Sequence, residues 1–262
     1  MPELPEVESN KIHLQETSQN KIIKNVEIRD DYVLKMPKDE FKKRIKDQKI
    51  NGFRRHGKWL FLKLNSENLL LHFGMSGYVQ YFDVPANEPE YSKILFEFEE
   101  GGYLSYISVR KLGEVKLIKD IDDFIKEEDL GPDACDISQE QFLAIMDTKG
   151  RSYAKSALMD QSAVAGIGNI FSDEILFQTK IYPKTRVSTI NKKKCTQIFD
   201  SMKEILKVAI KAKLNDDSLP DEWLISHRSK KGTCPICSSE IRRISVSGRH
   251  GYYCPKCQQK PD

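Results

Sequence analysis

The sequence lacks any run of about 20 apolar residues, the length needed to cross a bilayer, so no membrane partner is expected. Its first residues are acidic and contain no apolar stretch, which excludes a secretory signal. It also contains no internal repeat and no low-complexity tract. We therefore expect a globular protein in the cytoplasm, where cysteine thiols stay free or bind metal.

The formal net charge of +3 conceals an uneven distribution. Residues 1–139 carry 21 Lys/Arg and 26 Asp/Glu, whereas residues 140–262 carry 21 Lys/Arg and only 13 Asp/Glu. The basic half is suited to a polyanion. A lysine-rich solvated surface, as at residues 192–194, is the alternative interpretation.

The hydrophobic pattern changes near residues 129–133, which read as a linker. Before it, a helix within residues 1–18 precedes short alternating segments over residues 21–118, with one helix near residues 38–46. After it, the period is helical over about 138–147, 152–160, 168–177 and 188–212. Glycines at 161–168 predict a tight reversal, in either a helix–turn–helix element or an ordinary helical hairpin.

This pattern predicts an α+β fold: an N-terminal helix with a two-sheet antiparallel β-sandwich, then a helical domain and a C-terminal hairpin. The expected domains are residues 1–128, 136–231 and 232–262.

Four of the six cysteines form two Cys-x-x-Cys pairs separated by sixteen residues. Two such pairs at this spacing are typical of one structural Zn²⁺ held by four thiolates, in a stapled hairpin over residues 241–253. Disulfides or a redox motif are the alternatives, and both fit an intracellular chain poorly. The predicted ligands are Cys234, Cys237, Cys254 and Cys257; the spacing leaves Cys135 and Cys195 unpaired.

The amino terminus offers an unusual nucleophile. Removal of Met1 exposes Pro2 as a secondary amine, and α-amino groups titrate close enough to neutrality for a useful fraction to be unprotonated. Such an amine can attack an aldehyde or a sugar C1′ and form an iminium. Glu3 and Glu6 supply carboxyl groups nearby for proton transfer.

The opening residues Met1 to Glu8 resemble the start of the formamidopyrimidine-DNA glycosylase and endonuclease VIII family. The resemblance continues in order along nearly the whole chain. It includes the β-hairpin lysine motif, the intercalation loop, the helix–two-turn–helix signature and the zinc finger, at residues 55–60, 71–77, 164–170 and 234–257.

The resemblance implies a bifunctional DNA glycosylase and abasic-site lyase of base excision repair, acting as a monomer on damaged double-stranded DNA in the cytoplasm. Pro2 would be the nucleophile and Glu3 the general acid/base, with Glu6 assisting. Met75 would fill the void left by the flipped nucleotide, and Arg110 would face the orphan base. The remaining expected DNA contacts are Glu6, Lys58, His72, Lys155, Asn169 and Arg249, of which Lys58 and Arg249 would also support catalysis.

Three departures from the family pattern bear on substrate choice. Leu112 replaces the usual aromatic wedge, and Phe171 replaces a tyrosine. The segment 213–232 lacks the Gly- and Thr-rich loop that covers 8-oxoguanine in typical members. Formamidopyrimidines, 8-oxoguanine, hydantoins and oxidised pyrimidines therefore all stay open as substrates.

Two other classes of function remain as alternatives. A non-catalytic binder of damaged or abasic DNA with the same fold would keep the finger and the phosphate ligands. A zinc-ribbon protein-interaction factor would account for the last 30 residues alone.

Overall fold

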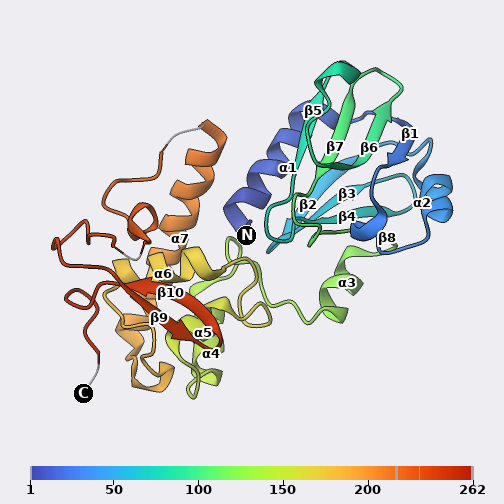
Figure 1. Ribbon diagram of the computed structural model, residues 1–262. Helices are drawn as coiled ribbons and strands as arrows, with labels where there is room; N and C mark the ends of the chain where they lie inside the picture. Colours follow the sequence, from blue (N-terminus) through green and yellow to red (C-terminus); the bar gives the residue numbers. More distant parts are fainter. Residues whose placement is uncertain (1, 216–217, 230, 261–262) are drawn as a thin grey trace. The chain divides into compact units, whose positions relative to one another are not determined.

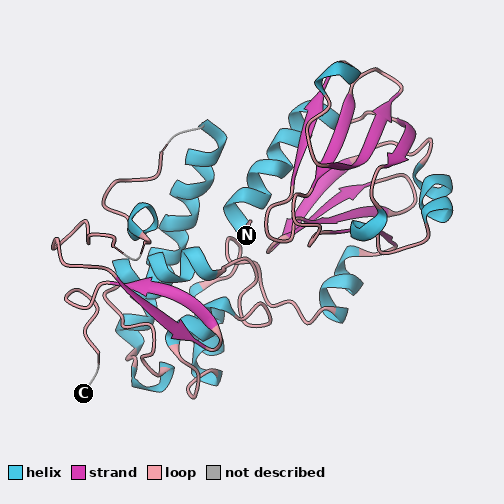
Figure 2. Cartoon of the chain, viewed as in Figure 1, coloured by secondary structure: helices cyan, strands magenta, loops and turns pink. Residues whose placement is uncertain are grey.

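The computed structural model describes residues 2–215, 218–229 and 231–260. The chain forms two compact units, Met1–Glu128 (unit 1) and Asp129–Asp262 (unit 2). Unit 1 is rich in strands, and unit 2 is mainly helical with a single hairpin among its described residues (Figures 1 and 2). None of the described helices is both long enough and apolar enough to span a membrane.

Unit 1 is built from two four-stranded antiparallel sheets, with strand orders β1-β6-β7-β5 and β2-β3-β4-β8. Alternating side chains from both sheets meet in one core, for example Phe96 from β6 and Leu71 from β4. The strands are β1 (Ile23–Ile28), β2 (Gly52–His56), β3 (Trp59–Lys63), β4 (Asn68–His72), β5 (Tyr78–Phe82), β6 (Ser92–Phe98), β7 (Tyr103–Ile107) and β8 (Glu114–Ile118).

Helix α1 (Leu4–Ser18) packs against β2 and β5, strands of different sheets. Val7 and Leu14 enter the sandwich core, since residues seven apart lie on one helical face. The side chain of Asn10 accepts the backbone N–H of Val79 at 2.9 Å, and that of His13 accepts the N–H of Tyr81 at 3.3 Å. These bonds use strand donors that would otherwise remain open at the edge.

Helix α2 (Lys38–Ile45) inserts Phe41 into the same core. Helix α3 (Ile121–Glu127) was not expected from the sequence, because seven residues rich in charge carry little periodicity. Its Phe124 packs edge-on against Trp59 and Phe61 of β3, at centroid distances of 5.0 and 5.7 Å. Short 3₁₀ turns are η1 (Asp31–Val33) and η2 (Pro85–Asn87).

Unit 2 contains helices α4 (Gln139–Thr148), α5 (Ala154–Met159), α6 (Asn169–Gln178) and α7 (Lys192–Asn215), with 3₁₀ turns η3 (Val187–Thr189) and η4 (Leu224–His227). The glycine-containing reversal separates α5 from α6. Gln161 stabilises it by donating to the carbonyl of Ile167 and accepting the N–H of Gly166.

The last two strands, β9 (Arg242–Val246) and β10 (Arg249–Tyr253), form a hairpin with a two-residue turn. Both turn residues, Ser247 and Gly248, have positive φ angles of 48° and 77°. This is the conformation whose twist matches that of paired strands. The predicted α+β fold, with sandwich, helices and finger hairpin, is thus confirmed; the division of unit 2 at residue 232 stays a prediction.

Candidate functional site

Pro2 lies two residues before the first residue of α1 and is half-buried. Glu3 is the N-cap residue of that helix and is only 1% exposed. Its backbone N–H donates to Oε2 of Glu6 at 3.0 Å, one of the two bonds of a capping box. Glu6 therefore fixes the first turn beside Pro2, whereas its expected contact with DNA stays a prediction.

The turn that carries Lys58 is tied to α1 by one arginine. Arg55 of β2 donates from Nε to Oε2 of Glu8 at 2.6 Å, with both side chains nearly buried, and from Nη1 to the carbonyl of Gly57 at 3.2 Å. Gly57 turns the chain with a φ of 55°, and Lys58 follows it at 7% exposure. The ion pair of Glu8 with Arg55 thus fixes the start of α1 and the turn before Lys58 relative to each other.

Glu8 and Arg55 both lie within the motifs of the family resemblance, but no role for either was predicted from the sequence. Their separation of 47 residues leaves no periodic signal to connect them.

His72 belongs to the expected intercalation loop, residues 71–77, and its ring lies 4.4 Å from that of Trp59 on the paired strand. Burial lowers the pKa of His72, and the charge of Lys58 lowers it further, while Glu114 opposes both effects. At neutral pH the ring is therefore uncharged and offers one N–H donor. A neutral His72 ring can donate this N–H to a phosphate oxygen, and it adds no charge to the partly buried site.

Two loops meet beside His72. Gly74 has a φ of 57°, and a Cβ placed on it would lie 2.3 Å from the carbonyl oxygen of Leu112. The hydroxyl of buried Tyr106 donates to the carbonyl of His72 at 2.7 Å. The two loops, residues 73–77 and 108–113, are therefore in backbone contact, which only glycine at position 74 permits.

The predicted wedge residues project from these loops. Met75 is 42% exposed and Leu112 is 50% exposed, and Arg110 is exposed as well. At this exposure Met75 is a surface residue, not a member of the sandwich core. Lys111 adopts a positive φ of 54°, and its Nζ pairs with Asp30 at 2.6 Å, which anchors the second loop to the sandwich.

In unit 2, Asn169 is the first residue of α6, whose first turn contains no acidic side chain. Its Nδ2 donates to the carbonyl of His250 at 2.9 Å. Its Oδ1 is buried without a hydrogen-bond partner among the described residues. The remaining N–H of the amide and the positive end of the helix dipole suit an anion such as phosphate.

Arg249 begins β10 next to His250 and is exposed. The bond from Asn169 to His250 therefore couples the two predicted phosphate ligands through the hairpin. Because the two-residue turn fixes the strand register, Arg249 projects from a rigid base.

The structure disfavours the predicted phosphate contact of Lys155, which stays untested. Its side chain is fully buried, and its Nζ donates to Asp173 at 2.5 Å, to Oγ of Ser172 at 2.9 Å and to the carbonyl of Asn169 at 3.1 Å. Lys155 has no exposed surface and its ammonium group already donates to three protein acceptors, so in this structure it acts beneath the surface. The sequence signal was only its place before the turn, which does not reveal burial.

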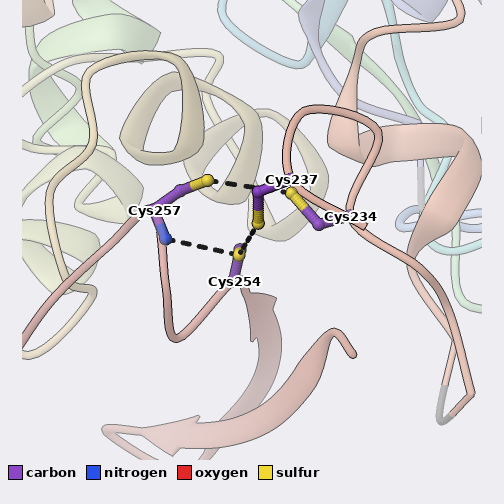
Figure 3. Close-up of side chains that lie close together, drawn as sticks. All are labelled: Cys234, Cys237, Cys254 and Cys257. Atoms are coloured by element: carbon purple, nitrogen blue, oxygen red, sulfur yellow. Dashed lines mark hydrogen bonds between the residues drawn. The ribbon is translucent and has the colours of Figure 1, made fainter. Parts of the chain in front are cut away.

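The four predicted zinc ligands converge at the base of the hairpin (Figure 3). All four sulfur atoms lie within 4.8 Å of one another, with separations of 3.8 Å for Cys234–Cys257 and 3.5 Å for Cys237–Cys254. Four thiolates at about 2.3 Å from a tetrahedral Zn²⁺ are spaced by about 3.8 Å, so the cluster fits the ion. With four sulfur ligands the coordination shell is closed, and the metal is structural.

The zinc cluster is continuous with the helical core. Cys234 and Cys254 pack with Phe177 of α6 and Leu224 of η4. The side chain of Gln258 donates to the carbonyl of Ile181 at 2.8 Å. Zinc binding therefore orders the surface on which α6 and the hairpin meet.

Comparison with known sequences finds three consecutive family matches. The formamidopyrimidine-DNA glycosylase N-terminal domain matches residues 1–115, the helix–two-turn–helix (H2TH) domain of the same glycosylase matches 130–218, and the zinc finger found in this glycosylase and in IleRS matches 232–260. The formamidopyrimidine-DNA glycosylase of Streptococcus pneumoniae is 31% identical, covering 99% of this chain and 100% of the relative. This chain belongs to the formamidopyrimidine-DNA glycosylase family.

Other relatives agree with this assignment. The formamidopyrimidine-DNA glycosylase of Oceanobacillus iheyensis is 33% identical over 98% of each chain. Among solved structures, Lactococcus lactis Fpg (MutM) in complex with DNA containing N7-benzyl-Fapy-dG superposes with a TM-score of 0.87 at 28% identity, covering 99% of this chain and 100% of that one.

The same enzyme bound to DNA containing an abasic site gives a TM-score of 0.87 at 27% identity, with 98% and 100% coverage. The protein is thus a DNA-repair glycosylase with a zinc finger. The roles of its individual site residues stay predictions.

Proposed function

We propose that this glycosylase is bifunctional, excising an oxidised base and then cleaving the strand through an iminium formed by the amine of Pro2. The substrates we propose are formamidopyrimidines, 8-oxoguanine or oxidised pyrimidines. Relatives bear the name formamidopyrimidine-DNA glycosylase, and their structures hold Fapy-dG or abasic DNA, which supports this class of substrate.

In the proposed reaction the nitrogen of Pro2 attacks C1′ while the damaged base leaves, and Glu3 protonates the ring oxygen so that the sugar opens. The resulting iminium acidifies the neighbouring C–H. β-Elimination then expels the 3′ phosphate and δ-elimination the 5′ phosphate. Hydrolysis of the remaining iminium frees Pro2.

The observation that carries this proposal is how the side chains are placed at the start of α1. A carboxylic acid that is 1% exposed follows the half-buried proline directly. The carboxyl group of Glu3 accepts the backbone N–H of Glu6, the other bond of the capping box, and is thereby held next to Pro2, where the proposed reaction needs a group that transfers protons. The pairing of Glu8 with Arg55 keeps the turn of Lys58, the proposed phosphate ligand beside the lesion, attached to this helix start.

The residues proposed to enter the base stack have the exposure that this role requires. Met75, Leu112 and Arg110 are exposed, so they are available to fill the stack and contact the orphan base. Asn169 and Arg249, coupled through the hairpin, would bind the phosphates on either side of the flipped nucleotide. Flipping costs a few kcal/mol, which such phosphate contacts offset.

Borohydride trapping tests the amine directly. Two preparations of the full zinc-loaded chain are compared: one with intact mass showing Pro2 at the terminus, and one in which an additional residue precedes Pro2. Only the first should form a reducible covalent adduct with an abasic duplex. Adducts from both, or from neither, would contradict the role of Pro2.

A substrate panel tests base excision and the alternative of a binder without chemistry. Duplexes carry 8-oxoguanine, formamidopyrimidine, thymine glycol, a hydantoin or an abasic site. Glu3→Gln should lose base excision while part of the abasic-site cleavage persists. Nanomolar binding to these duplexes without turnover by the mature chain would establish the non-catalytic alternative instead.

A further inference from the structure

A single buried carboxylate joins three segments of unit 2. Asp173 lies on α6 and is 0% exposed. Its Oδ1 accepts Nζ of Lys155 from α5 at 2.5 Å. Its Oδ2 accepts hydrogen bonds from Nη2 and Nε of Arg228, the residue after η4, at 2.9 and 3.2 Å. The same oxygen accepts a hydrogen bond from the backbone N–H of Tyr252 in β10 at 2.9 Å.

The two cations held by Asp173 also hold Asn169. The carbonyl oxygen of Asn169 accepts Nζ of Lys155 at 3.1 Å and Nη2 of Arg228 at 3.4 Å. The side-chain amide of the same asparagine donates to His250 of the hairpin. Asn169 is therefore fixed both through its main chain and through its side chain by groups connected to Asp173.

The hairpin packs directly against the ion pair of Asp173 with Lys155. A Cβ on Gly251 would lie 2.6 Å from Oδ1 of Asp173 and 3.0 Å from Nζ of Lys155. The guanidinium of Arg228 lies 5.4 Å from the ring centroid of Tyr252. Two cations and one carboxylate thus lie beneath the strand that begins with Arg249.

Stability alone does not account for this cluster. Buried ion pairs replaced by apolar side chains of similar volume are often no less stable, because desolvation offsets the attraction between the charges. A network whose members bond to one another in a single arrangement instead specifies position.

The neighbouring carboxylate extends the network toward the segment 213–232. Glu174 accepts the backbone N–H of Ile225 in η4 at 2.9 Å, and Arg228 follows three residues later. This segment stands where typical family members carry the loop that covers 8-oxoguanine, so it is expected to bear on the choice of lesion. Its C-terminal arm is therefore attached to the same turn of α6 that attaches the hairpin.

We propose that Asp173 is a positioning residue: it fixes Asn169 and the hairpin that carries Arg249 in one arrangement, and through Arg228 joins the end of the 213–232 segment to that arrangement. This inference rests on the proposed function of Asn169 and Arg249 as phosphate ligands. Asp173 touches neither DNA nor the reacting atoms, and acts through the two residues that do.

Binding to a duplex with a tetrahydrofuran abasic analogue tests the proposal, because this sugar cannot form the iminium and the readout is independent of the chemistry. Asp173→Asn keeps the shape and removes the charge. It should bind roughly ten-fold more weakly, with a salt slope reduced by about one phosphate contact. Zinc content should stay at one equivalent. Asp200→Asn, the same change at an exposed position of α7, should match the wild type.

A mutant cycle separates positioning from general destabilisation. If Asp173 acts through Asn169 and Arg249, adding Asp173→Asn to the variant Asn169→Ala/Arg249→Ala weakens binding no further. Arg228→Gln, which leaves the pair of Asp173 with Lys155 intact, should show a smaller loss with the same lack of additivity. Losses that multiply, or an Asp173→Asn variant that binds as the wild type does, would overturn the proposal.

The outcome is distinguishable from failure of the proposed chemistry. If the wild-type chain binds this duplex but forms no borohydride adduct with an abasic duplex, the role of Pro2 is refuted. The mutant cycle can still be interpreted, because it measures binding alone. An Arg249→Ala variant with unchanged affinity refutes the phosphate ligand, and the inference on Asp173 with it.

Discussion

The carboxyl group of Glu174 makes the stability of unit 2 depend on pH in an unusual direction. It is fully buried on α6, where it accepts the N–H of Ile225 at 2.9 Å and Nε2 of Gln178 at 2.7 Å. Burial raises the pKa of Glu174 from 4.5 to about 7, against the opposing effect of these bonds and of Arg228. The folded protein therefore holds this proton more tightly than the unfolded chain does.

It follows that the contribution of Glu174 to the free energy of unfolding is greatest below pH 4.5 and declines as the pH rises to about 7. The difference between the two pKa values corresponds to roughly 3 kcal/mol. Glu174→Gln keeps an acceptor for Ile225 and removes the titration. The variant should be more stable than the wild type by up to that amount at pH 8 and nearly equal to it at pH 5.

Urea unfolding from pH 5 to pH 8.5 measures this difference. The chain has two tryptophans, so a Trp59→Phe background leaves Trp223, immediately before η4, as the reporter of unit 2. Glu204→Gln, at an exposed position of α7, is the matched control and should show no such trend. A Glu174→Gln variant destabilised equally at both ends of the range would refute the reasoning, since the carboxylate would then be needed as a charged acceptor.

Three further outcomes are expected. Cys254→Ser should lower zinc content well below one equivalent and reduce DNA affinity, measured by metal analysis and by titration; full zinc content would contradict the four-thiolate site. Met75→Ala should slow base excision from duplexes several-fold yet spare cleavage of a single-stranded abasic oligonucleotide, in single-turnover assays. Tyr106→Phe should cost about 1 kcal/mol in urea unfolding, because it removes the hydrogen bond from the hydroxyl of buried Tyr106 to the carbonyl of His72; an unchanged free energy of unfolding would contradict this.

Much of the fold could be predicted from local pattern. Alternating apolar residues predicted the sandwich strands, and the period of 3.6 predicted the four longer helices of unit 2. The Cys-x-x-Cys spacing predicted the zinc site, because both knuckles are local in sequence and their chemistry admits few alternatives. Helix α3 was missed because its single packing residue, Phe124, gains its meaning only from β3.

The sequence by itself determined the family, the zinc ligands and the identity of the residues that could carry the chemistry, since these depend on motifs a few residues long. Only the tertiary structure decided how they are held. Glu8 meets Arg55 across 47 residues, and Asp173 meets Tyr252 across 79. Lys155 resembled a surface cation in the sequence and proved to be buried under the hairpin. Burial and pairing over such separations depend on how whole elements pack, which no local pattern encodes.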